Sequence, residues 1–528
     1  MMLLFTFTIA LAVAVHCAPA TSSLQVNTGS GTLHGFINSS APAVRQFLGV
    51  PFALPPTGAR RWLPPAAITN STPTFNATSF SPSCPQIPLS SLVQPVVYSY
   101  KARRLPDTKH LGSGTPASRG ATRLRLVLRW RLRAGRRDSL YFNAAPWVQR
   151  TQAHVVVTVN FRTNIFGFPN AAGLTEQNLG LLDQRAALEW VRTNIGAFGG
   201  DASRIVDWGQ SAGAIAVDYL NFAFPEDPIV HGFMMDSGTA LYPPLVIQSR
   251  DTAQINFVQV ATQLGCGLAA SQVDCLRGAS WQSIETLLSA NAGLTFLPIP
   301  DERIVFANYT ARYAAGAFAR VPALIGTNEH EFNAIIPHVP GVPFNDTLSD
   351  GLTNATFLCT AAATTQLRQA HGLATYRYRY DGDFPNISPP AFPGAYHAAE
   401  LPLIFGTAGQ YHGESTAYEN EVSMKLQDLW LDFARDPQLG LQGAGWNSYG
   451  AGKAVLLGDA DTPVKQIDVQ QLDDICTSGL LPGVTSRLWS IVLALSKCKR
   501  SPAFDWGTEP NFLLRQVQTE LELSPALP

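Results

Sequence analysis

The chain has 528 residues, of which 46% are hydrophobic and 14% are charged, and its formal net charge is −1. This composition excludes an intrinsically disordered protein, a coiled coil and a small disulfide scaffold, and the length suffices to bury a large core. The charge is uneven. Residues 101–140 hold ten Arg and two Lys against two acids, whereas the rest of the chain holds 25 basic and 36 acidic side chains. An acidic body with one basic segment does not indicate a nucleic-acid-binding protein, and it marks residues 101–140 as foreign to the rest.

The N-terminus predicts a secretory signal peptide over residues 1–20. Residues 3–15 form a mainly apolar run, and Ala18-Pro19-Ala20 matches the small-residue pattern of a cleavage site. A membrane anchor is the alternative, but the run is shorter than the ~20 residues that span a bilayer. We therefore expect a secreted protein, cleaved near Ala18–Ala20, without stable membrane insertion.

The cysteines and glycosylation sequons agree with an oxidising, extracellular address. Cys17 leaves with the signal peptide, and Cys266 and Cys275 are close enough in sequence to be the expected disulfide pair. Spacing alone leaves open the partners of Cys84, Cys359, Cys476 and Cys498. Seven N-x-S/T sequons are candidate glycosylation sites: Asn38, Asn70, Asn76, Asn308, Asn345, Asn354 and Asn386.

The first predicted elements of the mature chain are strands. Residues 24–49 show a β-type alternation between glycine turns, which predicts an antiparallel edge of a sheet. The glycine-rich piece Gly29–Gly35 could be taken for a phosphate loop. No Lys and helix follow it in the required context, so a hairpin turn is the better interpretation.

Beyond residue 150, strands and helices alternate, which predicts an α/β fold with a mostly parallel sheet flanked by helices. The apolar run His154–Asn160 is typical of a strand buried on both faces. Residues 178–195 place their apolar side chains on one helical stripe. Three more strands are predicted, at Arg204–Trp208, Phe233–Met235 and Val321–Ile325.

The segment Gly209-Gln210-Ser211-Ala212-Gly213 follows the Arg204–Trp208 strand and opens a small-residue helix. A G-x-S-x-G turn between strand and helix presents its serine as a nucleophile, and the helix N-terminus adds N–H donors for a developing oxyanion. The motif also recurs by chance, and a helix-capping serine is the alternative. The strand–turn–helix context favours Ser211 as a catalytic nucleophile.

A serine nucleophile needs a base and an orienting acid, which follow it in the order acid, then His, in folds with this turn. Glu331 lies in a loop after the Val321–Ile325 strand, and Glu329 is a near competitor. His397 stands in a Pro393–His397 loop before an apolar segment, where an active-site loop would hold it. Six histidines follow Ser211: His231, His330, His338, His371, His397 and His412.

These motifs together resemble the type-B carboxylesterase/lipase family, which includes cholinesterases and fungal secreted lipases. The resemblance covers roughly residues 24–100 and 141–476. The segments that carry it are Phe47–Gly58, Asn160–Phe168, Asn178–Asp201, the Ser211 turn with its preceding strand, Gly326–Glu331 and Pro393–Gly406.

The resemblance implies one α/β-hydrolase domain over residues 21–476, with residues 477–528 as a tail of uncertain role. It implies hydrolysis of small-molecule carboxylic esters without metal or organic cofactor and without nucleic acid, and it leaves the oligomeric state open. By motif position, Ser211 is the nucleophile, Glu331 the acid and His397 the base. The Ala212 N–H is then one oxyanion donor.

Two small departures from the family pattern lie next to these residues. The family usually has Glu before the nucleophile, where this chain has Gln210. Glutamine keeps the shape and loses the charge, so we expect altered tuning rather than lost activity. Where the family usually has Asp-Glu-Gly around the acid, this chain has His330-Glu331-Phe332.

The large departure is residues 101–140. The family has a Cys there that pairs with the equivalent of Cys84, and then a strand ending in a Gly-Gly-Gly segment whose N–H groups complete the oxyanion hole. Neither feature is present, and the glycine donors are expected near Arg129–Leu132. Possible codons for residues 101–111, read one base later, spell Arg-Gln-Asp-Asp-Cys-Leu-Thr-Leu-Asn-Ile. The codons CTA CGG TGG CGG CTT CGT, which encode residues 128–133, likewise become Tyr-Gly-Gly-Gly-Phe.

Two family segments recovered in one shifted frame indicate that residues 101–140 are translated out of frame. The alternative is a genuine basic insert. The function expected from the sequence is a secreted serine esterase or lipase. Two competitors remain: a non-catalytic binding protein on the same fold, which retention of Ser211, Glu331 and His397 argues against, and a catalytically impaired product that lacks its oxyanion donors.

Overall fold

The computed structural model describes residues 24–68, 73–80, 84–85, 111–114, 124–129, 143–242, 251, 253–291, 293–336, 344–388, 394–410 and 412–477. The predicted signal peptide, Asn70, His338, Cys498 and nearly all of the predicted tail lie outside these residues, as does most of 101–140. Among the residues described, no helix combines the length and apolarity needed to cross a membrane.

An eight-stranded sheet forms the centre of the molecule, with the strand order β14-β13-β12-β11-β10-β9-β7-β8. Every neighbouring pair is parallel except the β13–β14 hairpin at one edge. This is the mostly parallel α/β arrangement that the alternation of strands and helices predicts. The strands are β7 (Leu124–Arg129), β8 (His154–Thr158), β9 (Ile205–Gln210), β10 (Gly232–Asp236), β11 (Ala323–Asn328), β12 (Thr375–Tyr380), β13 (Lys453–Asp459) and β14 (Thr462–Asp468).

Helices cover both faces of this sheet, because successive strand residues point to opposite sides. Val156 and Trp208 pack with α1, α12 and α13 on one face. Val155 and Ile205 pack with α3 and α4 on the other. These helices span Ala145–Thr151 (α1), Leu179–Asn194 (α3), Ala212–Ala223 (α4), Leu401–Phe405 (α12) and Ala417–Arg435 (α13).

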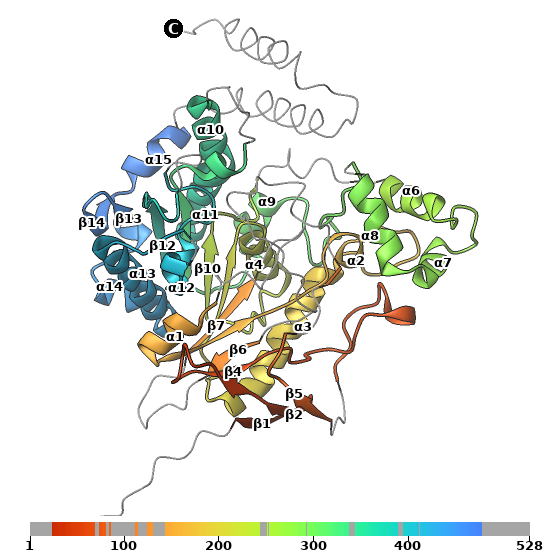
Figure 1. The fold of residues 1–528 in the computed structure, drawn as a ribbon. Helices are drawn as coiled ribbons and strands as arrows, with labels where there is room; N and C mark the ends of the chain where they lie inside the picture. Colours follow the sequence, from red (N-terminus) through yellow and green to blue (C-terminus); the bar gives the residue numbers. More distant parts are fainter. Residues whose placement is uncertain are drawn as a thin grey trace, which may run out of the picture.

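The remaining helices have several positions around the sheet. In Figure 1, α6, α7 and α8 gather at the opposite side of the molecule from α13, α14, β13 and β14. The bounds are α2 (Asn164–Gly167), α6 (Ile255–Gln263), α7 (Gln272–Gly278), α8 (Trp281–Ala290), α9 (Tyr309–Ala314), α10 (Asp346–Thr353), α11 (Cys359–Ala370), α14 (Gly440–Gly443) and α15 (Gln470–Thr477).

The N-terminal strands pair as predicted but do not join the eight-stranded sheet. Strand β1 (Gln25–Thr28) and β2 (Gly31–His34) form the expected antiparallel hairpin. With β5 (Thr74–Asn76) they make a sheet of their own, and β3 (Phe36–Ile37), β4 (Arg45–Phe47) and β6 (Leu111–Gly114) make another. Residues 24–49 thus supply the antiparallel edges of two small sheets.

Two disulfides are present among the described residues. Cys266 pairs with Cys275, as the short spacing predicts. Cys359 pairs with Cys476 across a separation of 117 residues, a link that spacing could not identify.

One sequon asparagine is buried in the folded chain. The side-chain amide of Asn386 donates to Glu419 Oε1 over 2.9 Å. The exposed asparagines remain candidates, namely Asn38, Asn76, Asn308 and Asn345. Asn354 is half-buried.

Candidate active site

Ser211 is the single residue between β9 and α4. Its backbone has φ 59° and ψ −128°, a conformation that non-glycine residues rarely adopt and that costs about 1–3 kcal/mol. Such strain persists where the surrounding structure fixes it, and here the Ser211 N–H donates to the Asp236 carbonyl over 2.8 Å. The turn lifts the serine out of the sheet at the carboxyl end of β9.

The glycine at position 209 is required by this turn. A Cβ placed on Gly209 would lie 2.3 Å from the backbone carbonyl carbon of Gly213, which no relaxation of a flexible side chain could relieve. The strand and the following helix can therefore approach closely only with glycine at this position, which accounts for its place in the motif.

His397 and Glu331 form a buried pair near the carboxyl ends of the strands. His397 Nδ1 lies 2.5 Å from Glu331 Oε2, and the other carboxylate oxygen, Oε1, accepts the Asn328 N–H over 2.8 Å. Glu331 is 0% exposed and His397 is 3% exposed. The carboxylate partner assigns the proton to Nδ1 and leaves Nε2 as the acceptor nitrogen, which is the form that a base requires.

The competing candidates have other partners. Glu329, the alternative acid, pairs with Arg379 over 3.1 Å. His330 contacts Asp350 over 3.2 Å. The rings of His231 and His371 bond backbone carbonyl groups. Among the described residues, His397 is the histidine that meets Glu331.

The second nitrogen of His397 faces the residue before Ser211. Gln210 Nε2 lies 3.2 Å from His397 Nε2, while the amide oxygen of Gln210 is buried without a partner among the described groups. Among the hydrogen bonds of the described residues, none joins the Ser211 hydroxyl to His397. Catalytic hydrogen bonds are often open in proteins without substrate and tighten in the complex.

Replacing Gln210 with glutamate is expected to move the acid limb of the kcat/KM profile to higher pH, by about one to two units. A carboxylate facing Nε2 would favour the imidazolium form, which cannot take a proton from Ser211. The measurement is kcat/KM for p-nitrophenyl acetate across the acid and neutral range. Gln210→Met, which has similar length and no charge, is the control. An acid limb shared by Gln210→Glu and wild type would contradict this role of the contact.

The Ala212 N–H lies at the start of α4, where helix N–H groups have no intrahelical acceptor. The strand that pairs with β9 next to the Ser211 turn is β7, whose last residue, Arg129, pairs with Gly209. Residues 130–142 lie outside the described chain. The position expected for the missing donors, near Arg129–Leu132, therefore begins where the described part of β7 ends beside the Ser211 turn.

Two further carboxyl groups are buried behind the pair. Glu400 Oε2 accepts the Asn328 side-chain amide over 2.6 Å, and burial raises the pKa of Glu400 well above its usual range. Asp236 accepts the Trp208 indole N–H over 2.5 Å and the Tyr378 hydroxyl over 2.8 Å. Burial and, secondarily, the Glu331 charge raise the pKa of Asp236 to about 7.

This raised pKa predicts a pH dependence of stability. Between about pH 4 and about pH 7, Asp236 binds more protons in the folded chain than in the unfolded chain. Its contribution to the free energy of unfolding is therefore complete below that range. It is lost as pH rises through the range, by as much as ~4 kcal/mol. Asp236→Asn keeps one oxygen as acceptor for the Trp208 indole, places an N–H opposite the Tyr378 hydroxyl, which can turn to accept it, and does not titrate. The thermal midpoint of wild type is therefore expected to fall more than that of the variant between mildly acidic and mildly alkaline buffer. An equal fall in the thermal midpoints of wild type and Asp236→Asn would contradict the raised pKa of Asp236.

Sequence reasoning missed Asn328, Asp236 and Glu400. Asn328 and Asp236 each end a strand of the central sheet, and polar side chains at the carboxyl ends of parallel strands are a recognisable signal of a site. Glu400 gave no comparable signal. Among the described residues, no group of three His, Cys, Asp or Glu side chains is arranged to hold a metal ion.

The comparisons with known proteins agree with one another. A family model described as "Carboxylesterase family" matches residues 22–94, 147–344 and 340–471. The chain is 40% identical to a chlorogenic acid esterase of Aspergillus niger over 82% of this chain and 88% of that protein. It is 37% identical to secreted lipase 5 of Gibberella zeae over 86% and 94%, and 27% identical to carboxylesterase 5A of Felis catus over 86% and 93%.

Proposed function

Because the chain belongs to the carboxylesterase family and is a carboxylic ester hydrolase, we propose that it works as a secreted serine hydrolase with an α/β-hydrolase fold over residues 21–476. Ser211 is the nucleophile, His397 the base and Glu331 the orienting acid. The observation that carries the proposal is the buried 2.5 Å contact between His397 and Glu331 beside the strained Ser211 turn.

The reaction follows from the positions of these groups. His397 Nε2 removes the proton from Ser211 Oγ as the oxygen attacks the ester carbonyl, and the same proton then passes to the departing alcohol. The acyl group stays on Ser211 until water, deprotonated by His397, releases the acid. Glu331 holds the Nδ1–H and stabilises the imidazolium, and it does not itself take the proton.

The negative charge on the carbonyl oxygen needs N–H donors. Ala212 supplies one at the start of α4, and its position at the N-terminus of a helix adds a favourable field. In the family the remaining donors come from a glycine segment, which is expected near Arg129–Leu132 in this chain. The sequence of residues 101–140 as it stands does not provide the glycine segment there.

The localisation and the substrate class are part of the proposal. The name of the Gibberella zeae relative, secreted lipase 5, includes the word "secreted", which supports the signal peptide over residues 1–20. The same name, together with "chlorogenic acid esterase", suggests either aromatic-acid esters or lipid esters as substrates. The buried His397–Glu331 pair argues against a non-catalytic binding protein, because a binding role needs no aligned base.

Hydrolysis of a p-nitrophenyl ester series from acetate to palmitate, together with chlorogenic acid and a triacylglycerol, tests this function. Ester cleavage that disappears in Ser211→Ala is the expected result, and the chain-length profile separates an esterase from a lipase. A folded wild-type protein without activity on any of these esters would favour the binding protein or the impaired product.

A further inference from the structure

An aromatic ring covers one face of His397. The ring of Phe357 lies 5.0 Å from the imidazole, centroid to centroid, with the planes 35° apart. Both side chains are 3% exposed. The two nitrogen edges of the imidazole already meet Glu331 and Gln210, so Phe357 adds a contact of a different kind, against the face of the ring.

Phe357 reaches this place through an irregular turn. A π-helical turn, Asn354–Leu358, separates α10 from α11. A π turn inserts an extra residue into a helix and re-aims the side chains around it, and such turns occur frequently at functional sites. The same turn packs Phe357 against Phe332 and Tyr242, each at 5.8 Å.

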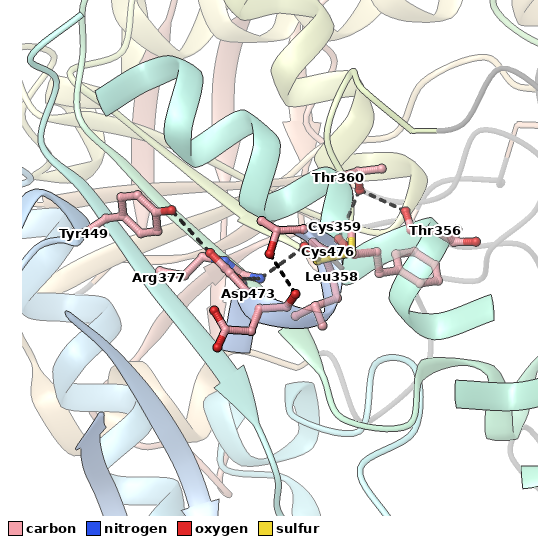
Figure 2. The surroundings of a disulfide bond; sticks show 11 residues. Thr356, Leu358, Cys359, Thr360, Arg377, Tyr449, Asp473 and Cys476 are labelled. Carbon is pink, nitrogen blue, oxygen red and sulfur yellow. Dashed lines mark hydrogen bonds and ion pairs between the residues drawn. A yellow bond between two sulfur atoms is a disulfide. The ribbon is translucent and has the colours of Figure 1, made fainter. Parts of the chain in front are cut away.

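The carbonyl groups of this turn have dedicated donors, which Figure 2 shows. The Thr360 hydroxyl donates to the carbonyls of Thr356 and Phe357 over 2.9 and 3.0 Å. The buried Arg377 guanidinium donates to the Leu358 carbonyl over 3.3 Å. Side chains outside the turn therefore bond three of its carbonyl groups, which restrains its shape.

A covalent link holds the end of the turn. Cys359, the first residue after it, is joined to Cys476 in α15. Asp473, one helical turn earlier in α15, lies 3.8 Å from Arg377 and accepts the Tyr449 hydroxyl over 3.3 Å. Disulfide and ion pair thus tie α15 to the segment that carries Phe357.

We propose that Phe357 is a positioning residue for His397, held in place by the Cys359–Cys476 disulfide and Arg377. The inference rests on the proposed function. The aromatic ring restrains the tilt of the imidazole, so that Nε2 stays beside the Ser211 turn, where it meets Gln210. It also attracts the positive charge that the ring gains in the transition state, and this attraction is strongest in a site without water.

The central test is the Phe357→Leu variant of the full chain. It is made in whichever version of residues 101–140, as given or with the reading frame restored, hydrolyses p-nitrophenyl acetate. We expect kcat to fall about tenfold with KM nearly unchanged, since the lost interaction is made mainly in the transition state. The matched control is Leu352→Val, which lies in the same apolar cluster on α10. An equal kcat in Phe357→Leu and wild type would overturn the proposal. A raised KM at unchanged kcat would also overturn it, because Phe357 would then line the substrate pocket.

A second comparison tests the link to the disulfide. The double variant Cys359→Ala/Cys476→Ala is expected to have a lower kcat than wild type when both are assayed at a temperature where they remain folded. Adding Phe357→Leu to this double variant should cause little further loss of kcat, because both changes act through the Phe357 ring. Fully additive losses would separate the disulfide from Phe357. Phosphonylation of Ser211 in wild type is followed in parallel. Its absence would mean that the proposed function has failed, whereas labelling with an unaffected Phe357→Leu variant would reject the positioning role alone.

Discussion

Replacing Ser211 with alanine is expected to lower kcat for ester hydrolysis by roughly 10⁵- to 10⁶-fold, because nucleophile and base act as a unit and neither works without the other. The folded structure should survive, since the hydroxyl makes no hydrogen bond to His397 within the described residues and the turn is held by backbone contacts. Burst and steady-state kinetics on p-nitrophenyl esters measure the loss. KM should change much less than kcat.

Ser237 offers a matched control for this experiment. It is also a buried serine at positive φ, 55°, and it follows the next strand, β10. Its hydroxyl has no hydrogen-bond partner in the described chain. Ser237→Ala should therefore stay within about threefold of wild type, as most substitutions away from the reacting groups do. Retained activity in Ser211→Ala would refute the assignment of the nucleophile.

Restoring the shifted reading frame over residues 101–140 is expected to raise kcat by roughly 10⁴-fold or more, because each missing oxyanion donor costs about 10²–10³ in rate. The family model leaves residues 95–146 unmatched, which brackets this segment. Strand β7 nevertheless occupies the place between β8 and β9, so the sequence Leu-Arg-Leu-Val-Leu-Arg stands in a central strand.

The same restoration is expected to stabilise the protein. The backbone register sets Arg125 beside Val155 and Ile205, in two strands whose residues there are buried. Arginine is an unfavourable residue type in the sequence of a strand between two buried strands, because burying a charge without a partner costs several kcal/mol, and the restored sequence would lack it. Thermal midpoints and ester hydrolysis of the two full-length proteins, each also with Ser211→Ala, make the measurement. Equal Ser211-dependent activity in both would show that the basic segment is genuine and that other N–H groups bind the oxyanion.

Short-range sequence patterns were sufficient to predict the strands and helices around the Ser211 turn. The continuous apolar run at β8, the helical stripe of α3 and the G-x-S-x-G turn each follow from short-range sequence, and their observed bounds differ from the predicted ones by about two residues, as is usual for element ends. The loop positions of Glu331 and His397 came mainly from the family resemblance. Spacing alone left Glu329 and five other histidines open.

Features that depend on tertiary contact could not be predicted. The Cys359–Cys476 pair joins residues 117 positions apart, and connectivity among distant cysteines is not encoded by spacing. The π turn that carries Phe357 has no signature in a sequence read for a 3.6-residue period. The sequon at Asn386 gave no sign that its amide is buried against Glu419, because a three-residue motif carries no information about burial.

The Cys359–Cys476 disulfide also divides the active site between two topological parts of the chain. His397 lies inside the covalent loop that the disulfide closes, whereas Ser211 and Glu331 lie outside it. A protease that cuts the backbone once anywhere between residues 359 and 476 therefore produces two fragments that remain joined. His397 therefore keeps a covalent connection to Ser211 and Glu331 after such a nick.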